Sequence, residues 1–227
     1  SRLASMGEMI SNIAHQWRQP LNALAMRVQD VPLAVQFDEM NLDYATNFKT
    51  ESMELIRYMS QTIDDFRNFF KPDKEKKEFD LRDSIKKANA IVKDAMKSSY
   101  IDILLELPEE ELNIFGYPSE FSQVLINILN NAKDALNEHK KDGDKHIKIT
   151  AHKSGDNIVV SVADNAGGVP DAIIDKIFDP YFSTKSASQG TGLGLYMSKM
   201  IIEQNMGGKL GVRNTEDGAC FEMVFVG

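Results

Sequence analysis

Apolar side chains recur every three or four positions over the first 70 residues, the spacing of a helix that buries one face. From Leu42 to Phe70, seven of the nine positions at this spacing are apolar. The earlier run keeps the same spacing until Pro20, after which its apolar positions shift by one residue. A proline kink produces such a shift. We therefore predict two long helices, joined near residues 36–42.

Two helices of this length cannot bury both apolar seams by themselves. Pairing two such hairpins into a four-helix bundle buries both seams at once. The pattern therefore predicts a homodimer.

The pattern changes after Pro72 and the charged stretch 72–78. Short β-rich runs now alternate with helical stretches, which is typical of a mixed α and β domain. We expect strands over 101–107, 145–153, 157–164, 209–214 and 219–226, and helices over 82–97, 118–138 and 192–206. The predicted fold class is α+β, with a helical hairpin at 1–71, a charged linker at 72–78 and a second domain at 79–227.

Composition and charge exclude several classes of protein. The net charge of −8 is spread along the chain and offers no basic surface for nucleic acid. The single cysteine, Cys220, excludes an intramolecular disulfide and suits a reducing cytoplasm. The sequence contains no run of about 18 apolar residues, the length that a helix needs to span a membrane. The chain begins in a helical pattern without a methionine, so we expect a fragment of a longer protein, which leaves a membrane anchor elsewhere open.

The helix expected at 118–138 carries an apolar stripe and an opposite polar stripe. The polar stripe holds Glu120, Gln123, Asn127, Asn131 and Asp134. A solvated face is the ordinary explanation. However, two asparagines one turn apart are poor helix formers, and oxygen donors on one face suit Mg²⁺ bound together with phosphates.

Two glycine-rich loops add candidate chemistry. Asp164 ends a predicted strand, where it either caps the turn or accepts a hydrogen bond from an exocyclic amine. Gly168 in this turn allows close approach of the backbone. Gly190, Gly192 and Gly194 precede a helix, where exposed N–H groups bind phosphate, although a mobile surface loop has the same composition. The polar segment 179–191 reads as a lid over a nucleotide.

These segments together resemble one family. The motifs "NILNNAKDAL", "DNAGGVP", "IFDPYFSTK" and "GTGLGL" follow one another as the N, G1, F and G2 boxes of the histidine-kinase ATP-binding domain do. The segment "AHQWRQPLNAL" resembles the phosphoacceptor box of the dimerisation domain. The resemblance implies an α/β two-layer sandwich that binds ATP, following a dimerisation hairpin.

The resemblance also implies roles for single residues. Asn131 would hold Mg²⁺ against the ATP phosphates, with Asn127 and Asp134 in the same box. Asp164 would select adenine through its 6-amino group. The remaining residues expected at the nucleotide are Gly168, Lys185, Gly190, Thr191, Gly192, Leu193 and Gly194. The motif departs from the family at Ala166, where glycine is common.

His15 is the expected phosphoacceptor. It lies two positions from each neighbouring seam residue, and no second metal ligand follows at the next helical turn. The resemblance implies that ATP phosphorylates His15, and that the phosphoryl group passes to an aspartate of a response-regulator receiver domain. Gln16 and Gln19 stand where relatives often carry an acid and a Thr or Asn, so phosphatase activity is left open. Pro20 should loosen the helix beside His15.

Two other functions fit parts of the pattern. One is an ATPase of the same fold that is not a kinase, which the helix bearing His15 disfavours. The other is a catalytically silent dimeric scaffold that senses nucleotide, which the intact Asn131 and Asp164 disfavour.

Overall fold

The computed structural model describes residues 2–70, 75–140, 143–185 and 190–226, without the side chains of residues 2–16, 61 and 64–70. The chain divides into two compact units. One contains residues 1–71 and 181–193, and the other contains residues 72–180 and 194–227. The predicted domain boundaries stay a prediction.

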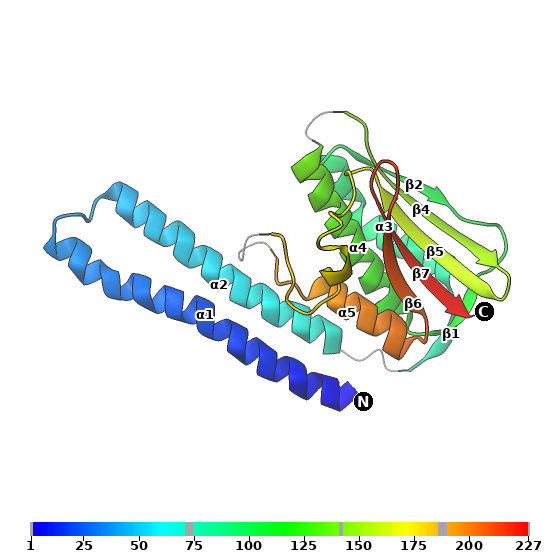
Figure 1. The fold of residues 1–227 in the computed structure, drawn as a ribbon, viewed down its shortest axis with the longest axis horizontal. Coiled ribbons are helices and arrows are strands. Elements are labelled where there is room, and N and C mark those ends of the chain that lie inside the picture. Colours follow the sequence, from blue (N-terminus) through cyan, green and yellow to red (C-terminus); the bar gives the residue numbers. More distant parts are fainter. Residues whose placement is uncertain (1, 71–74, 141–142, 186–189, 227) are drawn as a thin grey trace. The chain divides into compact units, whose positions relative to one another are not determined.

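The first unit contains the predicted helical hairpin (Figure 1). Helix α1 spans Arg2–Gln36 and helix α2 spans Leu42–Phe70. Asn41 begins α2 as its N-cap, because its Oδ1 accepts a hydrogen bond of 2.9 Å from the Tyr44 N–H. Helix α1 continues through Pro20 and Pro32, so the register change at Pro20 does not end the helix.

Among the side chains that the structure describes, the hairpin leaves an apolar stripe uncovered. Several side chains of the predicted seam are exposed by 42–80%: Leu21, Val28, Val35, Leu42, Ile56 and Ile63. Others lie on the less exposed side, among them Leu24, Val31, Ser52 and Met59. The hairpin therefore has one face that it covers itself and a second apolar face that it does not cover, as a bundle of two hairpins requires.

The second unit is built on a five-stranded sheet with the order β2-β4-β5-β7-β6. Its strands are β2 (Ile101–Glu106), β4 (Lys145–Ser154), β5 (Asn157–Asp164), β6 (Lys209–Asn214) and β7 (Ala219–Val226). β2 and β4 are parallel, and the other neighbours are antiparallel. These strands confirm the five predicted ones.

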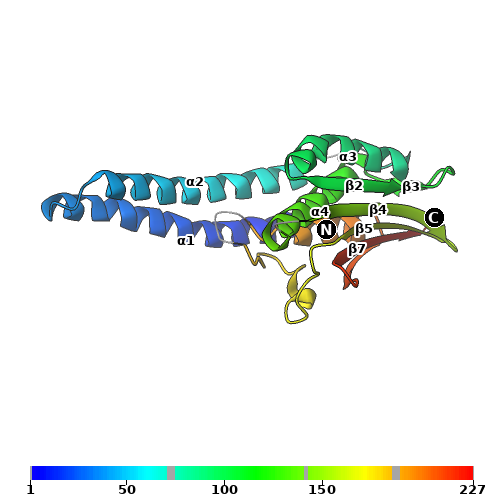
Figure 2. The same cartoon turned by 90° about the horizontal axis from the view of Figure 1, so that it is seen from above.

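Helices α3 (Leu81–Ser98), α4 (Pro118–His139) and α5 (Gly194–Met200) lie together on one side of this sheet (Figures 1 and 2). The predicted inward stripe of α4 is confirmed, since Phe121, Leu125, Ile128, Ala132 and Leu136 are all buried. The helix predicted at 192–206 differs in detail. After Met200 it continues as a π-helical segment, Ile201–Asn205, and it ends at Gly207, whose φ is +72°.

The sequence did not predict two short strands or a 3-10 turn. β1 (Lys77–Asp80) pairs antiparallel with β3 (Asn113–Gly116), and the 3-10 turn is Ile174–Lys176. β1 begins inside the stretch 72–78 that was predicted to be a linker. Four residues are too few to show a clear alternation of apolar and polar positions.

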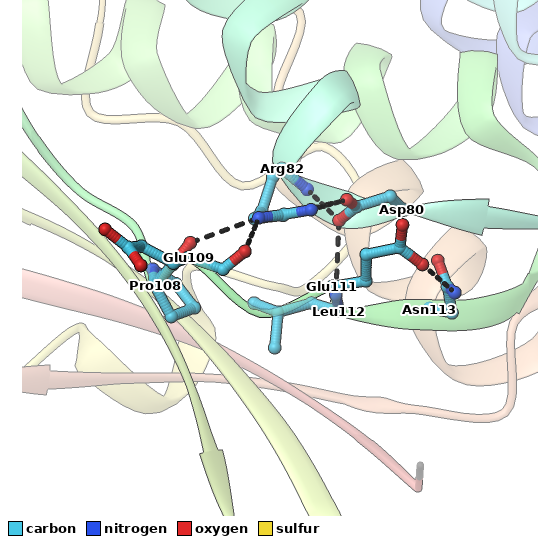
Figure 3. Close-up of polar contacts among 7 residues, drawn as sticks. All are labelled: Asp80, Arg82, Pro108, Glu109, Glu111, Leu112 and Asn113. Carbon is cyan, nitrogen blue, oxygen red and sulfur yellow. Dashed lines mark hydrogen bonds and ion pairs between the residues drawn. The ribbon is translucent and has the colours of Figure 1, made fainter.

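An ion-pair network fixes the junction between β1 and α3 (Figure 3). Asp80 is the N-cap of α3, and its Oδ1 accepts hydrogen bonds from the N–H groups of Arg82 and Leu112, at 3.0 and 3.3 Å. Its Oδ2 lies 2.8 Å from Nε and 2.6 Å from Nη2 of Arg82. Nη1 of Arg82 donates to the carbonyl oxygens of Pro108 and Glu109. The network thus joins β1 and α3 to the segment before β3.

Among the described residues, no helix combines the length and the apolar content that crossing a bilayer requires.

Candidate functional site

Asp164 occupies a core-facing position at the end of β5. Ile158, Val160 and Val162 point to the buried side of the strand, and Asp164 is the next residue in the same alternation. Its side chain is 7% exposed. The period of the strand therefore carries a carboxylate to the edge of the core.

One oxygen of this carboxylate is used and the other remains available. Oδ1 accepts hydrogen bonds from the backbone N–H groups of Ala166, at 2.9 Å, and Ala219, at 3.3 Å. In the described part of the chain nothing donates a hydrogen bond to Oδ2. Burial raises the pKa of Asp164, and the two backbone donors oppose that rise without cancelling it. Asp164 therefore caps the turn through Oδ1 and offers a second acceptor to a ligand.

The turn after Asp164 is glycine-rich for a structural reason. Gly167 and Gly168 have φ values of +91° and +85°, in the left-handed region that side chains disfavour. Ala166 is not among the residues with positive φ, and its methyl group is buried. Alanine at this departure from the family motif therefore imposes no backbone strain.

The turn between β6 and β7 contacts Asp164 and the glycine turn, which the sequence did not predict. A Cβ on Gly218 would lie 2.0 Å from the carbonyl oxygen of Asp164, so only glycine fits there. Asn214, at the start of the same turn, contacts the backbone of Val169. The stretch "NTEDG" does predict a turn, but its residues do not predict which loop that turn contacts.

The polar face of α4 is present, with one correction. Asn127, Asn131 and Asp134 are half-buried residues on one face of the helix. Glu120, which the pattern assigned to the same solvated stripe, is buried, and its Oε2 accepts a hydrogen bond of 2.7 Å from Nδ2 of Asn205. The assignment failed because the chain folds a later segment over the first turn of α4.

Asn127 connects α4 to the start of α5. Its Nδ2 donates to Oγ of Ser198 at 2.9 Å, and that hydroxyl donates to the carbonyl oxygen of Gly194 at 2.9 Å. A Cβ on Gly194 would lie 2.5 Å from Oδ1 of Asn127. Gly194 is therefore needed for close approach of the two helices.

The predicted lid is divided between the two compact units: residues 179 and 180 belong to the unit that contains the sheet, and the lid residues from Tyr181 onward belong to the unit that contains the hairpin. Within the lid, the Tyr181 N–H donates to the carbonyl oxygen of Gly192 at 2.8 Å, and a Cβ on Gly192 would meet the Tyr181 backbone at 2.3 Å. The hydroxyl of Thr191 accepts a hydrogen bond of 3.4 Å from the N–H of Leu193, whose side chain is fully buried. These contacts define the local shape of the lid.

Two further lid residues lie close to Ser183. Its Oγ accepts a hydrogen bond of 3.1 Å from the Lys185 N–H. A Cβ on Gly190 would lie 2.6 Å from the same atom. Residues 186–189, which complete the predicted lid, lie outside the described residues. A position of the lid over a nucleotide stays a prediction.

The predicted phosphoacceptor box lies on α1. The backbones of His15 and Gln16 are helical, and their side chains lie outside the described residues. Gln19 is exposed and Pro20 is buried. The roles of His15, Gln16 and Gln19 stay predictions.

Across the described ranges, no three His, Cys, Asp or Glu side chains gather closely enough to form a metal centre.

Comparison with known proteins places these features in a family. Residues 116–226 match the model of the histidine kinase-, DNA gyrase B- and HSP90-like ATPases. The chain is 28% identical over 225 residues to the two-component sensor PprA of Pseudomonas aeruginosa, covering 97% of this chain and 24% of that protein. It is 30% identical over 208 residues to the histidine-protein kinase AtoS of Escherichia coli, covering 91% and 32%. The chain thus spans about a quarter to a third of these relatives.

Solved structures agree with this relationship. The catalytic domain of the histidine kinase ThkA is 33% identical, with a TM-score of 0.60, covering 67% of this chain and 95% of that one. A structure of ThkA in complex with the response regulator TrrA is 26% identical, with a TM-score of 0.64, covering 99% of this chain and 62% of the other.

Proposed function

Because this chain belongs to the histidine kinase family, we propose that it is the catalytic core of a two-component sensor kinase. It binds ATP beside Asp164 and transfers the γ-phosphoryl group to His15. The phosphoryl group then passes to an aspartate of a response-regulator receiver domain. The solved complex of ThkA with its response regulator supports a partner of this kind.

The observation that carries the proposal is the divided role of the Asp164 carboxylate. Oδ1 is held by two backbone N–H groups, and Oδ2 is left as an acceptor beside a glycine turn. Adenine presents an amine at its 6-position, where guanine presents a carbonyl oxygen. A carboxylate oxygen therefore accepts a hydrogen bond from adenine and repels guanine, which makes ATP the expected nucleotide.

The polar face of α4 suits the phosphates. Asn131 and Asn127 supply amide groups one helical turn apart. We assign Mg²⁺ to Asn131, because amide and phosphate oxygens are ligands that this ion accepts, and we place Asp134 beside them. When bound, Mg²⁺ neutralises charge on the phosphates. Lys185, Thr191 and the lid glycines are the groups that we propose to close over them.

The transfer needs no base. Above pH 7 an imidazole with an ordinary pKa of about 6.5 is mostly neutral and has one nitrogen lone pair. That nitrogen attacks the γ-phosphorus of ATP. A P–N bond forms as the bond to the β–γ bridging oxygen breaks, and ADP leaves with the electron pair. The phosphorylated ring then carries a positive charge, and it releases its remaining N–H proton to water. The amide oxygen of Gln16 can accept a hydrogen bond from the ring N–H, which fixes the tautomer.

We further propose that the protein works as a homodimer in the cytoplasm, held by the uncovered apolar stripe of the hairpin. Residues such as Val28 and Ile56, which are 55% and 42% exposed, then pack against a second copy. Gln19 is exposed, and its amide can orient a water molecule. We therefore include a phosphatase activity toward the partner regulator in the proposal.

Incubation with γ-labelled ATP tests the proposal. A kinase retains acid-labile label on the protein, and His15→Ala loses that label. His139→Ala is a matched control, because this histidine is exposed at the end of α4 and should leave labelling unchanged. Release of labelled phosphate without a labelled protein would instead support an ATPase of the same fold. Nucleotide binding with neither signal would support a silent scaffold.

A further inference from the structure

The turn between β6 and β7 holds the glycine turn beside Asp164 by three hydrogen bonds. Oδ1 of Asn214 accepts a hydrogen bond from the Val169 N–H at 2.8 Å, and Nδ2 of Asn214 donates to the Val169 carbonyl oxygen at 2.7 Å. The carbonyl oxygen of Asp217 accepts a third bond, of 2.9 Å, from the Gly167 N–H. One side-chain amide therefore satisfies both backbone polar groups of Val169.

These bonds act on the part of the loop that has the most conformational freedom. Gly167 and Gly168 both have positive φ, and glycine loses more backbone entropy on ordering than other residues do. A Cβ on Gly168 would lie 2.7 Å from Oδ1 of Asn214. The glycine turn and the Asn214 side chain are therefore in direct contact, and the amide selects one conformation of a segment that would otherwise sample many.

The same turn also supports the carboxylate. It leads into Ala219, whose N–H donates to Oδ1 of Asp164. A single hairpin turn thus orders both sides of the proposed nucleotide site, the carboxylate and the glycine turn.

We propose that Asn214 is a positioning residue for nucleotide binding, acting through the backbone of Val169 on the glycine turn. The inference rests on the proposed binding of ATP beside Asp164. Asn214 does not contact the reacting groups. It reduces the entropy that the loop loses when the nucleotide binds, so its loss should weaken binding and leave the chemical step unchanged.

Asn214→Ala removes both side-chain bonds and tests the proposal. Because Asn214 is exposed to solvent, we expect the two bonds together to change affinity modestly, with a rise in the Kd of ATP of about fivefold. The KM for ATP in autophosphorylation should rise by the same factor, while the rate at saturating ATP stays unchanged. Isothermal titration calorimetry and initial rates measure these quantities on the whole chain.

Two variants sharpen the result. Asn214→Asp keeps the size of the side chain but places a carboxylate oxygen opposite the Val169 carbonyl oxygen, so it should weaken ATP binding at least as much as alanine does. Asn157→Ala is the matched control, because Asn157 is an exposed asparagine at the start of β5. It should leave both Kd and KM unchanged.

The outcomes separate this inference from the proposed function. If the wild-type chain does not bind ATP, the proposed function fails. If the wild type binds ATP and Asn214→Ala binds it equally well, the inference is wrong while the function stands. A fall in the rate at saturating ATP with an unchanged KM, or wild-type affinity in Asn214→Asp, also overturns it.

Discussion

Replacing Asp164 by asparagine should lower the affinity for ATP without lowering the folding stability. In the folded chain the carboxylate is buried, which raises its pKa and makes its charged form costly. Asparagine keeps an oxygen that can accept from the N–H groups of Ala166 and Ala219, at the positions now 2.9 and 3.3 Å from Oδ1. It removes the buried charge, so the unliganded variant should melt at the same temperature as the wild type or a higher one.

The affinity for ATP should fall. Asp164→Asn replaces the available Oδ2 acceptor by an NH₂ group that faces the adenine amine. A hydrogen bond to a charged group contributes about 1.5–3 kcal/mol, which corresponds to a rise in Kd of roughly 10- to 150-fold. In the variant, the NH₂ group of asparagine and the adenine amine are both hydrogen-bond donors and face each other, which weakens binding further. The estimated rise in Kd is therefore a lower limit.

Two measurements on the same samples test this reasoning. Calorimetric titration gives the Kd of ATP, and thermal unfolding without nucleotide gives the melting temperature. Asp156→Asn is the matched control, since Asp156 lies exposed in the turn between β4 and β5 and should change neither quantity. An unchanged Kd would refute the role of Asp164 in binding adenine. A melting temperature lowered by many degrees would show that the side chain acts mainly as a cap.

Three further predictions concern the second unit. Asp80→Ala removes the N-cap of α3 and leaves the buried N–H of Leu112 without its acceptor, so denaturant titration should show a loss of about 3 kcal/mol in the free energy of unfolding. Gly218→Ala places a methyl group against the carbonyl oxygen of Asp164, and should lower the melting temperature and abolish ATP binding together. In a carbon-13 titration, Asp164 should lose its charge at a higher pH than exposed aspartates. Asp80 should lose it at a lower pH, because the donors from Arg82 and Leu112 outweigh the burial that raises its pKa.

The two carboxylates therefore affect stability with opposite signs as the pH falls. Asp80 has a folded-state pKa below its ordinary value, so its contribution is complete above the ordinary carboxyl pKa and is lost on acidification. Asp164 has a raised pKa, so its charge opposes folding at neutral pH. This cost decreases as the pH falls through the raised pKa and is absent below the ordinary carboxyl pKa. Acid unfolding curves of Asp80→Asn and Asp164→Asn should shift in opposite directions relative to the wild type.

The sequence predicted the long elements well because each buries a complete face. The stripe of α4 from Phe121 to Leu136 and the alternation of β5 both follow directly from burial. The strands β1 and β3 were missed because four residues show little periodicity. Glu120 was misplaced because its partner, Asn205, lies 85 positions away in the sequence.

The candidate site was predictable only in part for a similar reason. Asp164 and the glycines after it form a local motif, so a single stretch of sequence identifies them. Asn214 and Gly218 act on this motif from another hairpin, and only the order of strands in the sheet brings them there. When a residue positions a loop that is distant in the sequence, the residues next to it in the chain do not predict that role.

Ala166 illustrates how such a loop can vary without losing its shape. The two residues after it take up the left-handed backbone, so this position is free to carry a side chain. An alanine has fewer conformations than a glycine in the unfolded chain, which stabilises a compatible fold by about 0.4–1 kcal/mol. A departure from the family motif that looks like a loss of flexibility thus lowers the entropy cost of ordering this loop when the chain folds.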